Sequence, residues 1–226
     1  MIPRERLAVA LDFDDVETAL ALAKRVEPWF GVAKVGLELW ATAGPTIVAA
    51  LRDTGFEVFC DLKYHDIPTT VGRAARVIGR LGARYLNIHA CGGVDMLRAG
   101  VEGFEEGARD ARFPSPVALG VTVLTSDLDA GAFDARLAWA IDAGCGGVVC
   151  SAHEIAAVRA RDESLVTVVP GIRLERGDRH DQARVATPEF ALSAGASVIV
   201  VGRALTRAAE PEAVAEEIAR CASDDQ

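Results

Sequence analysis

The sequence predicts a (β/α)8 barrel that forms one domain over residues 1–226. Short apolar runs alternate with helix-like segments eight times along the chain, without a linker, a repeat or a low-complexity stretch between them. Half of the residues are hydrophobic, and the chain is long enough for one such barrel. The alternative, a doubly wound open sheet, would need fewer strands and a glycine-rich first turn, whereas the first turn here is Asp12-Phe13-Asp14.

The expected strands are short runs rich in Val, Ile, Leu and Ala, and several of them end in charged or hydroxyl residues. That ending matters because the C-terminal ends of all strands in a parallel barrel meet at one mouth, where active sites are built. In chain order, the predicted strands are Leu7–Leu11, Val32–Leu37, Phe56–Cys60, Tyr85–His89, Pro116–Leu124, Gly147–Cys150, Leu165–Val169 and Val198–Val201.

A helix is expected after each strand. The first is preceded by Asp14 and Asp15, which suit a helix N-terminus because their charge complements the helix dipole. The final residues, 223–226, are expected to fray. In chain order, the predicted helices are Val16–Val26, Pro45–Arg52, Val71–Leu81, Val94–Ala108, Phe133–Ala143, His153–Arg161, Pro188–Ala194 and Glu212–Cys221.

Composition excludes several classes of function. The net charge of −9 argues against a nucleic-acid partner, which requires a basic face, but a few cations gathered in one pocket can still bind a small anion. No apolar run reaches the roughly 18 residues of a membrane helix. The N-terminal residues show no signal-peptide core, so a cytoplasmic location is the default expectation. The five cysteines form no zinc-type pair, and most are expected to be buried, reduced thiols.

The stretch from Asp61 to Thr70 is the strongest candidate for chemistry. Alternate side chains of a strand share a face, so Asp61 and Lys63 should point the same way, with Asp66 in the turn that follows. Acid, base and acid then gather at a strand end that opens into the barrel mouth. The weaker interpretation is a solvated strand end with an incidental ion pair.

Lysine is rare in this chain, which makes Lys63 more informative. The sequence contains three lysines against 21 arginines. An ammonium group can release a proton at neutral pH where its surroundings favour the neutral form, whereas a guanidinium effectively cannot. Lys63 is therefore a candidate for proton transfer. Chance or codon bias is the alternative explanation for a retained lysine. It is the explanation offered for Lys24, which is expected on the first helix.

Other strand ends add polar groups to the same mouth. Asp12 ends the first strand, and Lys34 on the second can neighbour Asp61 across the ladder. Thr125 and Ser126 place two hydroxyls at the end of the fifth strand. The sequence therefore predicts a polar, charged pocket at the C-terminal ends of the strands.

The last two strands predict a phosphate site. They end in Pro170-Gly171-Ile172-Arg173 and Val201-Gly202-Arg203. Phosphate sites of barrels are often built from these two loops, glycine permits close backbone approach, and arginine binds phosphate through two donors. The polar loop over residues 174–182, which contains Gln182, could close over a ligand. Each arginine alone would be interpreted as a surface charge.

Histidine, cysteine and metal sites are weaker candidates. His89 could line the pocket or be a satisfied core residue, His65 suits a turn, and Cys91 has no adjacent base that would make it a nucleophile. Asp12, Asp61 and His89 are a conceivable metal-ligand set. Lys34 and Lys63 already supply positive charge there, so no metal is predicted.

Together these residues resemble the orotidine 5′-phosphate decarboxylase family over nearly the whole chain. The resemblance implies decarboxylation of orotidine 5′-monophosphate (OMP) to UMP and CO2 in de novo pyrimidine biosynthesis, by a homodimer that uses no cofactor and no metal. It rests on Asp61-Leu62-Lys63-x-x-Asp66-Ile67-Pro68-x-Thr70, Val123-Leu124-Thr125-Ser126, Pro170-Gly171-Ile172-Arg173, Asp181-Gln182 and Val201-Gly202-Arg203.

The resemblance also implies residue roles. Lys63 would give a proton to C6 within a charge network of Lys34, Asp61, Lys63 and Asp66, and Asp66 and Thr70 would reach the partner subunit's site. The remaining substrate contacts would be ribose at Asp12, Lys34 and Thr70, the nucleotide at Thr125 and Ser126, and phosphate at Arg173, Gln182, Gly202 and Arg203, with Asp61 and Pro170 also in contact with the substrate. Two positions depart from the family pattern: Cys91 where serine is common, and Ala204 where proline is common.

Two rival functions stay open at this point. Related phosphosugar barrels, such as hexulose-phosphate synthases and keto-gulonate-phosphate decarboxylases, share the Asp-x-Lys-x-x-Asp core, and membership among them would favour Mg²⁺ dependence. A catalytically silent protein that binds nucleotide phosphates is the rival from another class. Activity on OMP in the presence of EDTA would separate the first, and UMP binding without turnover would support the second.

Overall fold

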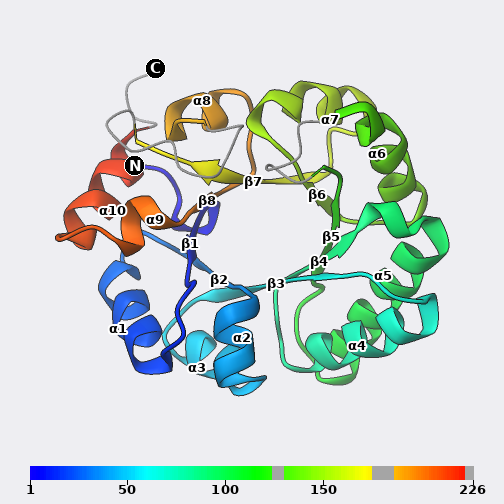
Figure 1. The fold of residues 1–226 in the computed structure, drawn as a ribbon, viewed down its shortest axis with the longest axis horizontal. Helices are drawn as coiled ribbons and strands as arrows, with labels where there is room; N and C mark the ends of the chain where they lie inside the picture. The colour runs from blue at the N-terminus through cyan, green and yellow to red at the C-terminus, as the bar shows by residue number, and fades with distance from the viewer. Residues whose placement is uncertain (124–129, 175–185, 222–226) are drawn as a thin grey trace.

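The computed structural model describes residues 1–123, 130–174 and 186–221, and in these ranges eight parallel strands close into a barrel. Each strand pairs with the next along the chain, and β1 pairs with β8 to complete the ring (Figure 1). The predicted fold class is therefore confirmed. The strands are β1 Leu7–Ala10, β2 Val32–Val35, β3 Glu57–Tyr64, β4 Tyr85–His89, β5 Val117–Val121, β6 Gly147–Val149, β7 Val166–Ile172 and β8 Val198–Val201.

The helices lie around the outside of the barrel (Figure 1). Most agree with the predicted ranges to within three residues, but α2 and α9 were not predicted. Leu37, expected at the end of a strand, instead begins α2. The helices are α1 Val16–Val26, α2 Leu37–Ala43, α3 Thr46–Asp53, α4 Pro68–Arg80, α5 Val94–Asp110, α6 Phe133–Asp142, α7 Ile155–Arg161, α8 Pro188–Ser193, α9 Arg203–Thr206 and α10 Pro211–Arg220. Short 3-10 turns precede four elements, at Arg4–Arg6, Ala90–Gly92, Ala130–Ala132 and Ala152–Glu154.

Local chemistry explains where two of these helices begin. The Thr18 N–H donates to Asp15 Oδ2 at 2.7 Å, so the predicted N-terminal acid does cap α1. Helix α4 begins at Pro68, three residues before the predicted Val71. Proline suits a first helical position because the N–H it lacks would have no partner there. We call the stretch from Asp61 to Thr70 the central motif; the loop that joins its strand part to α4 is therefore shorter than the sequence suggested.

The apolar core has two layers. One lies between the strands and the helices, and the other is a smaller cluster inside the barrel. The side chains of the inner cluster are Ala8, Ala10, Val32, Phe59, Tyr85, Val117, Leu119, Val168, Val198 and Val200. Alternate residues of a strand share a face, so the residues two positions further along these strands also point inward. Their side chains line the mouth of the barrel.

Strands β3 and β7 extend further than predicted. Strand β3 runs to Tyr64 rather than Cys60, so Asp61 and Lys63 lie within the strand, and β7 runs to Ile172 and includes Pro170. In both strands the pairing register shifts near the C-terminal end, between Cys60 and Tyr64 and between Val169 and Ile172. Such irregularities change the direction of side chains and are common next to active sites. The sequence did not predict these strand ends because they contain charged residues or proline, which are uncommon inside strands.

Helices α4 and α5 lie side by side and pack closely (Figure 1). A Cβ added at Gly107 would overlap the Arg76 carbonyl, and one at Gly103 would overlap the Gly72 carbonyl. The two backbones can approach this closely only because glycines stand at the contact. Helix α4 directly follows the strand that carries Asp61 and Lys63. The contact with α5 therefore holds the C-terminal end of the motif in position.

The described ranges contain no helix that combines the length and the apolar composition needed to cross a lipid bilayer. All five cysteines are free thiols, and Cys60, Cys145 and Cys150 are buried as predicted, whereas Cys91 is exposed.

Candidate active site

A cavity of about 520 Å³ opens at the C-terminal ends of the strands. It lies directly above the inner apolar cluster, and its polar lining follows from strand alternation. Two residues beyond Ala10, Val32, Phe59 and Tyr85 of that cluster stand Asp12, Lys34, Asp61 and Asn87. The cavity brings together eight predicted site residues: Asp12, Lys34, Asp61, Lys63, Pro170, Arg173, Gly202 and Arg203.

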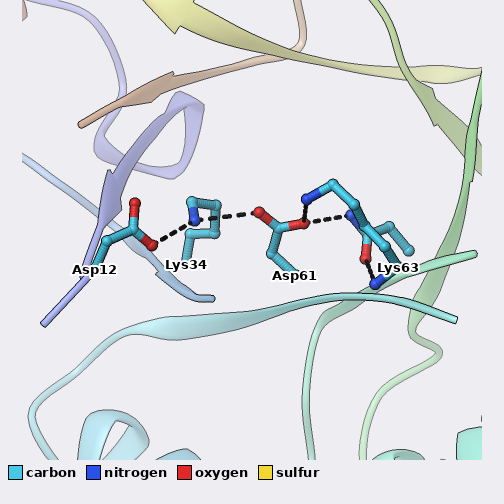
Figure 2. Close-up of polar contacts among 5 residues, drawn as sticks. Asp12, Lys34, Asp61 and Lys63 are labelled. Atoms are coloured by element: carbon cyan, nitrogen blue, oxygen red, sulfur yellow. Dashed lines mark hydrogen bonds and ion pairs between the residues drawn. The ribbon is translucent and has the colours of Figure 1, made fainter. Parts of the chain in front are cut away.

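Four of these residues form a row of alternating charge across three neighbouring strands (Figure 2). Lys34 Nζ lies 3.0 Å from Asp12 Oδ1 and 3.1 Å from Asp61 Oδ2. Lys63 Nζ lies 2.5 Å from the other oxygen of Asp61, Oδ1. The predicted proximity of Lys34 and Asp61 and the shared face of Asp61 and Lys63 are both confirmed.

Burial and charge compete at the centre of this row. Burial by itself would raise the pKa of Asp61, but the ammonium groups of Lys34 and Lys63 outweigh it and hold the pKa at about 2. Burial would likewise lower the pKa of Lys34, and the carboxylates of Asp61 and Asp12 reverse the sign and raise it. Both groups are therefore charged at neutral pH although their side chains are largely shielded from water.

Asn87 belongs to this site and was missed by sequence reasoning. It lies on β4, is only 1% exposed, and is the one asparagine of the whole chain. Its Nδ2 donates to Asp61 Oδ1 at 2.6 Å, and its Oδ1 accepts from the Lys63 N–H at 2.8 Å. A single amide between the apolar Leu86 and Ile88, in phase with the inward Tyr85, is the signal that could have identified it.

The opposite side of the cavity carries the arginines. Arg173 follows β7, Gly202 and Arg203 follow β8, and Thr206 and Arg207 also line the cavity. Burial and the nearby charge of Arg203 both lower the pKa of Arg173. An anion bound between the two guanidinium groups would relieve that repulsion. Arg207 was not predicted, because it lies beyond the Gly-Arg pair, on the far side of the unpredicted helix α9.

Gly36 is a second site residue that the sequence did not reveal. A Cβ added there would lie 2.6 Å from Asp12 Oδ1 and 3.4 Å from Lys34 Nζ. The first distance is far below van der Waals contact, so a larger residue would push the Asp12 carboxylate away from its position beside Lys34. This glycine leaves room for the charge row.

Some predicted residues are not in the cavity of one chain. Asp66 and Thr70 are exposed and do not line it, and the Asp66 carboxylate accepts a hydrogen bond from the Ile67 N–H at 2.6 Å. Within a single chain, the expected network of Lys34, Asp61, Lys63 and Asp66 therefore lacks its fourth member. Thr125, Ser126, Gln182 and most of the proposed closing loop over 174–182 lie outside the described residues.

The expectation that Cys91 has no adjacent base was wrong. Its Sγ lies 3.5 Å from His65 Nδ1, and the rings of His65 and His89 are 5.8 Å apart between centroids. The sequence hid this contact because the two residues come from the ends of neighbouring strands. Burial first, and then the charges of His65 and Lys63, lower the pKa of His89.

Within the described ranges, no three His, Cys, Asp or Glu side chains are grouped so that they could hold a metal ion.

A closed parallel barrel with a charged cavity at the C-terminal ends of its strands is the construction of a (β/α)8-barrel enzyme. Comparison with known proteins specifies which group of barrels this is. The profile of the orotidine 5'-phosphate decarboxylase / HUMPS family matches residues 5–218, and the chain belongs to this family.

Named relatives agree with the family match over almost the full length. Orotidine 5'-phosphate decarboxylase of Anaeromyxobacter sp. (strain K) is 48% identical, with 97% of this chain and 99% of the relative covered. The protein of that name from Moorella thermoacetica is 43% identical, with 97% and 92% covered. The crystal structure of orotidine 5'-phosphate decarboxylase from Lactobacillus acidophilus is similar with a TM-score of 0.78 at 32% identity, covering 96% of this chain and 99% of that one.

Proposed function

We propose that this chain is a carboxy-lyase that decarboxylates orotidine 5′-monophosphate to UMP and CO2 in pyrimidine biosynthesis. The names of relatives between 41% and 48% identical support the activity. The observation that carries the proposal for this chain is the Lys63 ammonium, held 2.5 Å from the Asp61 carboxylate at the wall of a cavity whose other side carries arginines.

The cavity supports one orientation of the nucleotide. The phosphate binds between Arg173 and Arg203, with Gly202 allowing the backbone to approach. A Cβ at Gly202 would meet only Ala10 Cβ at 3.7 Å, an ordinary contact, so packing within the chain does not require glycine there. The ribose hydroxyls bind at Asp12 and Lys34, and the pyrimidine ring then reaches Lys63. Thr125, Ser126 and Gln182 complete the contacts in this proposal.

The chemistry needs a cation where charge develops. The bond between C6 and the carboxylate breaks, CO2 leaves, and the electron pair stays on C6. The Lys63 ammonium stabilises this charge and donates a proton to C6, which yields UMP, and the neutral amine regains its proton from water. Because Asp61 holds the ammonium in place before the reaction, and Lys34 in turn holds Asp61, little reorganisation is needed in the transition state.

A homodimer is part of this proposal. Asp66 and Thr70 are exposed just before and within the first turn of α4, outside the cavity of their own chain. Ile67, between them, is 66% exposed, so an apolar side chain stands beside the two polar ones on this surface. We propose that this segment packs against a second copy of the chain. There Asp66 approaches the proton-donating lysine of the partner's cavity, and Thr70 approaches the ribose of the nucleotide bound in that cavity.

One assay tests the activity. Purified protein treated with EDTA is mixed with OMP, and the loss of OMP absorbance is followed. Steady turnover without added metal supports the proposal and its independence of metals and cofactors. Turnover that requires Mg²⁺, or activity only on phosphosugars, would instead place the chain with the related phosphosugar barrels, such as the hexulose-phosphate synthases. Tight UMP binding without OMP turnover would indicate a silent binding protein.

A further inference from the structure

The end of β3 has an unusual backbone conformation at the proposed proton donor. Lys63 has a φ of 48°, in the left-handed region that side-chain-bearing residues adopt infrequently. The β3–β4 register shifts between Cys60 and Tyr64, so regular ladder pairing is interrupted at this point. A strained conformation of this kind persists only where surrounding groups hold it in place.

The Asn87 side chain provides such a hold. Its amide bonds two parts of the motif at once: the Lys63 N–H donates to Oδ1 at 2.8 Å, and Nδ2 donates to Asp61 Oδ1 at 2.6 Å. The side-chain amide thus takes the place of a ladder partner for Lys63. A primary amide is suited to this task because it carries an acceptor and a donor on one rigid plane.

The same contacts also orient the Asp61 carboxylate. Its Oδ1 accepts from both Asn87 Nδ2 and Lys63 Nζ, while its Oδ2 faces Lys34 Nζ at 3.1 Å. Asn87 is almost fully buried and comes from the neighbouring strand β4, so it holds Asp61 and Lys63 from outside their own strand. The carboxylate plane is therefore set from three sides.

We propose that Asn87 is a positioning residue for the decarboxylation. It holds the left-handed Lys63 backbone and shares Asp61 Oδ1 with the ammonium, and so sets where Lys63 Nζ stands in the cavity. This inference rests on the proposed function and deepens it. Asn87 itself does not touch the reacting atoms.

The test compares three variants for kcat and KM on OMP. Asn87→Leu removes both hydrogen bonds. Asn87→Asp keeps the acceptor for the Lys63 N–H but replaces the donor to Asp61 with a second carboxylate. Thr167→Val is the matched control, because Thr167 is also a fully buried polar residue on a strand, hydrogen-bonded to Ser197 but outside the cavity.

We expect Asn87→Leu and Asn87→Asp each to lower kcat by ~10- to 100-fold, the loss that a displacement of about 1 Å can cause, with KM changed by less than ~3-fold. Thr167→Val should keep kcat near wild type. In Asn87→Leu, hydrogen exchange of the Lys63 amide should accelerate, whereas Asn87→Asp should retain protection because its acceptor remains. A purely structural role would reduce stability without this split between kcat and KM.

Normal kcat in either folded Asn87 variant, or an equal loss of kcat in Thr167→Val, would overturn the inference. If Asn87→Leu does not fold, Asn87→Asp alone decides between the outcomes. Failure of the proposed function is distinguishable, since wild type would then show no OMP turnover. In that case, unchanged exchange of the Lys63 amide in Asn87→Leu would still contradict the positioning role, and accelerated exchange would support the hold on the backbone.

Discussion

Lys34 and Lys63 contact opposite oxygens of a single carboxylate, that of Asp61, at 3.1 and 2.5 Å. The two ammonium groups come from neighbouring strands and are held apart by the group that binds both. Removing either lysine leaves the buried carboxylate with one cation, and removing Asp61 leaves two cations facing each other. Mutations in this row should therefore be strongly non-additive.

Replacing Lys63 by alanine should lower kcat on OMP by more than ~10²-fold, because both charge stabilisation and proton donation are lost. UMP should still bind, since the arginine side of the cavity is unchanged. Steady-state kinetics and UMP titration measure both quantities. Lys24→Ala is the control, because Lys24 is an exposed lysine on α1. Near-normal turnover in Lys63→Ala would remove Lys63 from its role.

Replacing Arg203 by alanine should raise KM for OMP by ~10-fold or more while changing uridine binding little, because the arginine contacts only the phosphate of the proposed substrate. Arg207→Ala should show a smaller effect of the same kind. Arg161→Ala, an exposed arginine on α7, serves as the control. Equal losses for OMP and uridine would show that Arg203 supports the cavity in general rather than phosphate recognition.

Replacing Gly36 by alanine should reduce kcat/KM by ~10-fold or more, because the new Cβ would stand 2.6 Å from Asp12 Oδ1 and force the Asp12–Lys34 pair apart. Gly202→Ala provides the contrast. Its Cβ has room within the chain, so KM for OMP should rise without the crowding of neighbouring side chains that Gly36→Ala causes. Kinetics and thermal unfolding of both variants check this, and unchanged kcat/KM in Gly36→Ala would contradict the crowding argument.

The Asp61 carboxyl should titrate near pH 2, as its pKa of about 2 implies, and this can be followed by carbon NMR of its side chain. The unperturbed value in an unfolded chain is ~3.9. Since the folded pKa is the lower one, the ionised carboxylate contributes stability that is present above about pH 4 and is lost as the pH falls toward 2. In Lys63→Ala the midpoint should rise, because one of the two cations is gone. An unchanged midpoint would mean that Lys63 does not interact with Asp61 in solution.

The central motif shows which structural features a local sequence pattern can predict. Asp61 and Lys63 could be assigned to one face because strand alternation is a local property. The extension of β3 to Tyr64 could not, because charged residues in a row look like a turn until a neighbouring strand supplies hydrogen bonds. Asn87 illustrates the same limit: its strand was predicted with the correct bounds, yet its two partners lie 24 and 26 residues earlier in the chain.

The sequence by itself determined the closed barrel, the strand ends that carry Asp12, Lys34, Asp61 and Lys63, and the two arginines after the last strands. These depend on apolar periodicity and chain order, which are written along the chain. Only the tertiary structure decided that Asn87 holds the Lys63 backbone, that Gly36 makes room for the charge row, and that Arg207 faces the cavity. Those relationships arise where strands and loops distant in sequence pack against each other, and packing distances of a few ångströms are a property of the folded backbone.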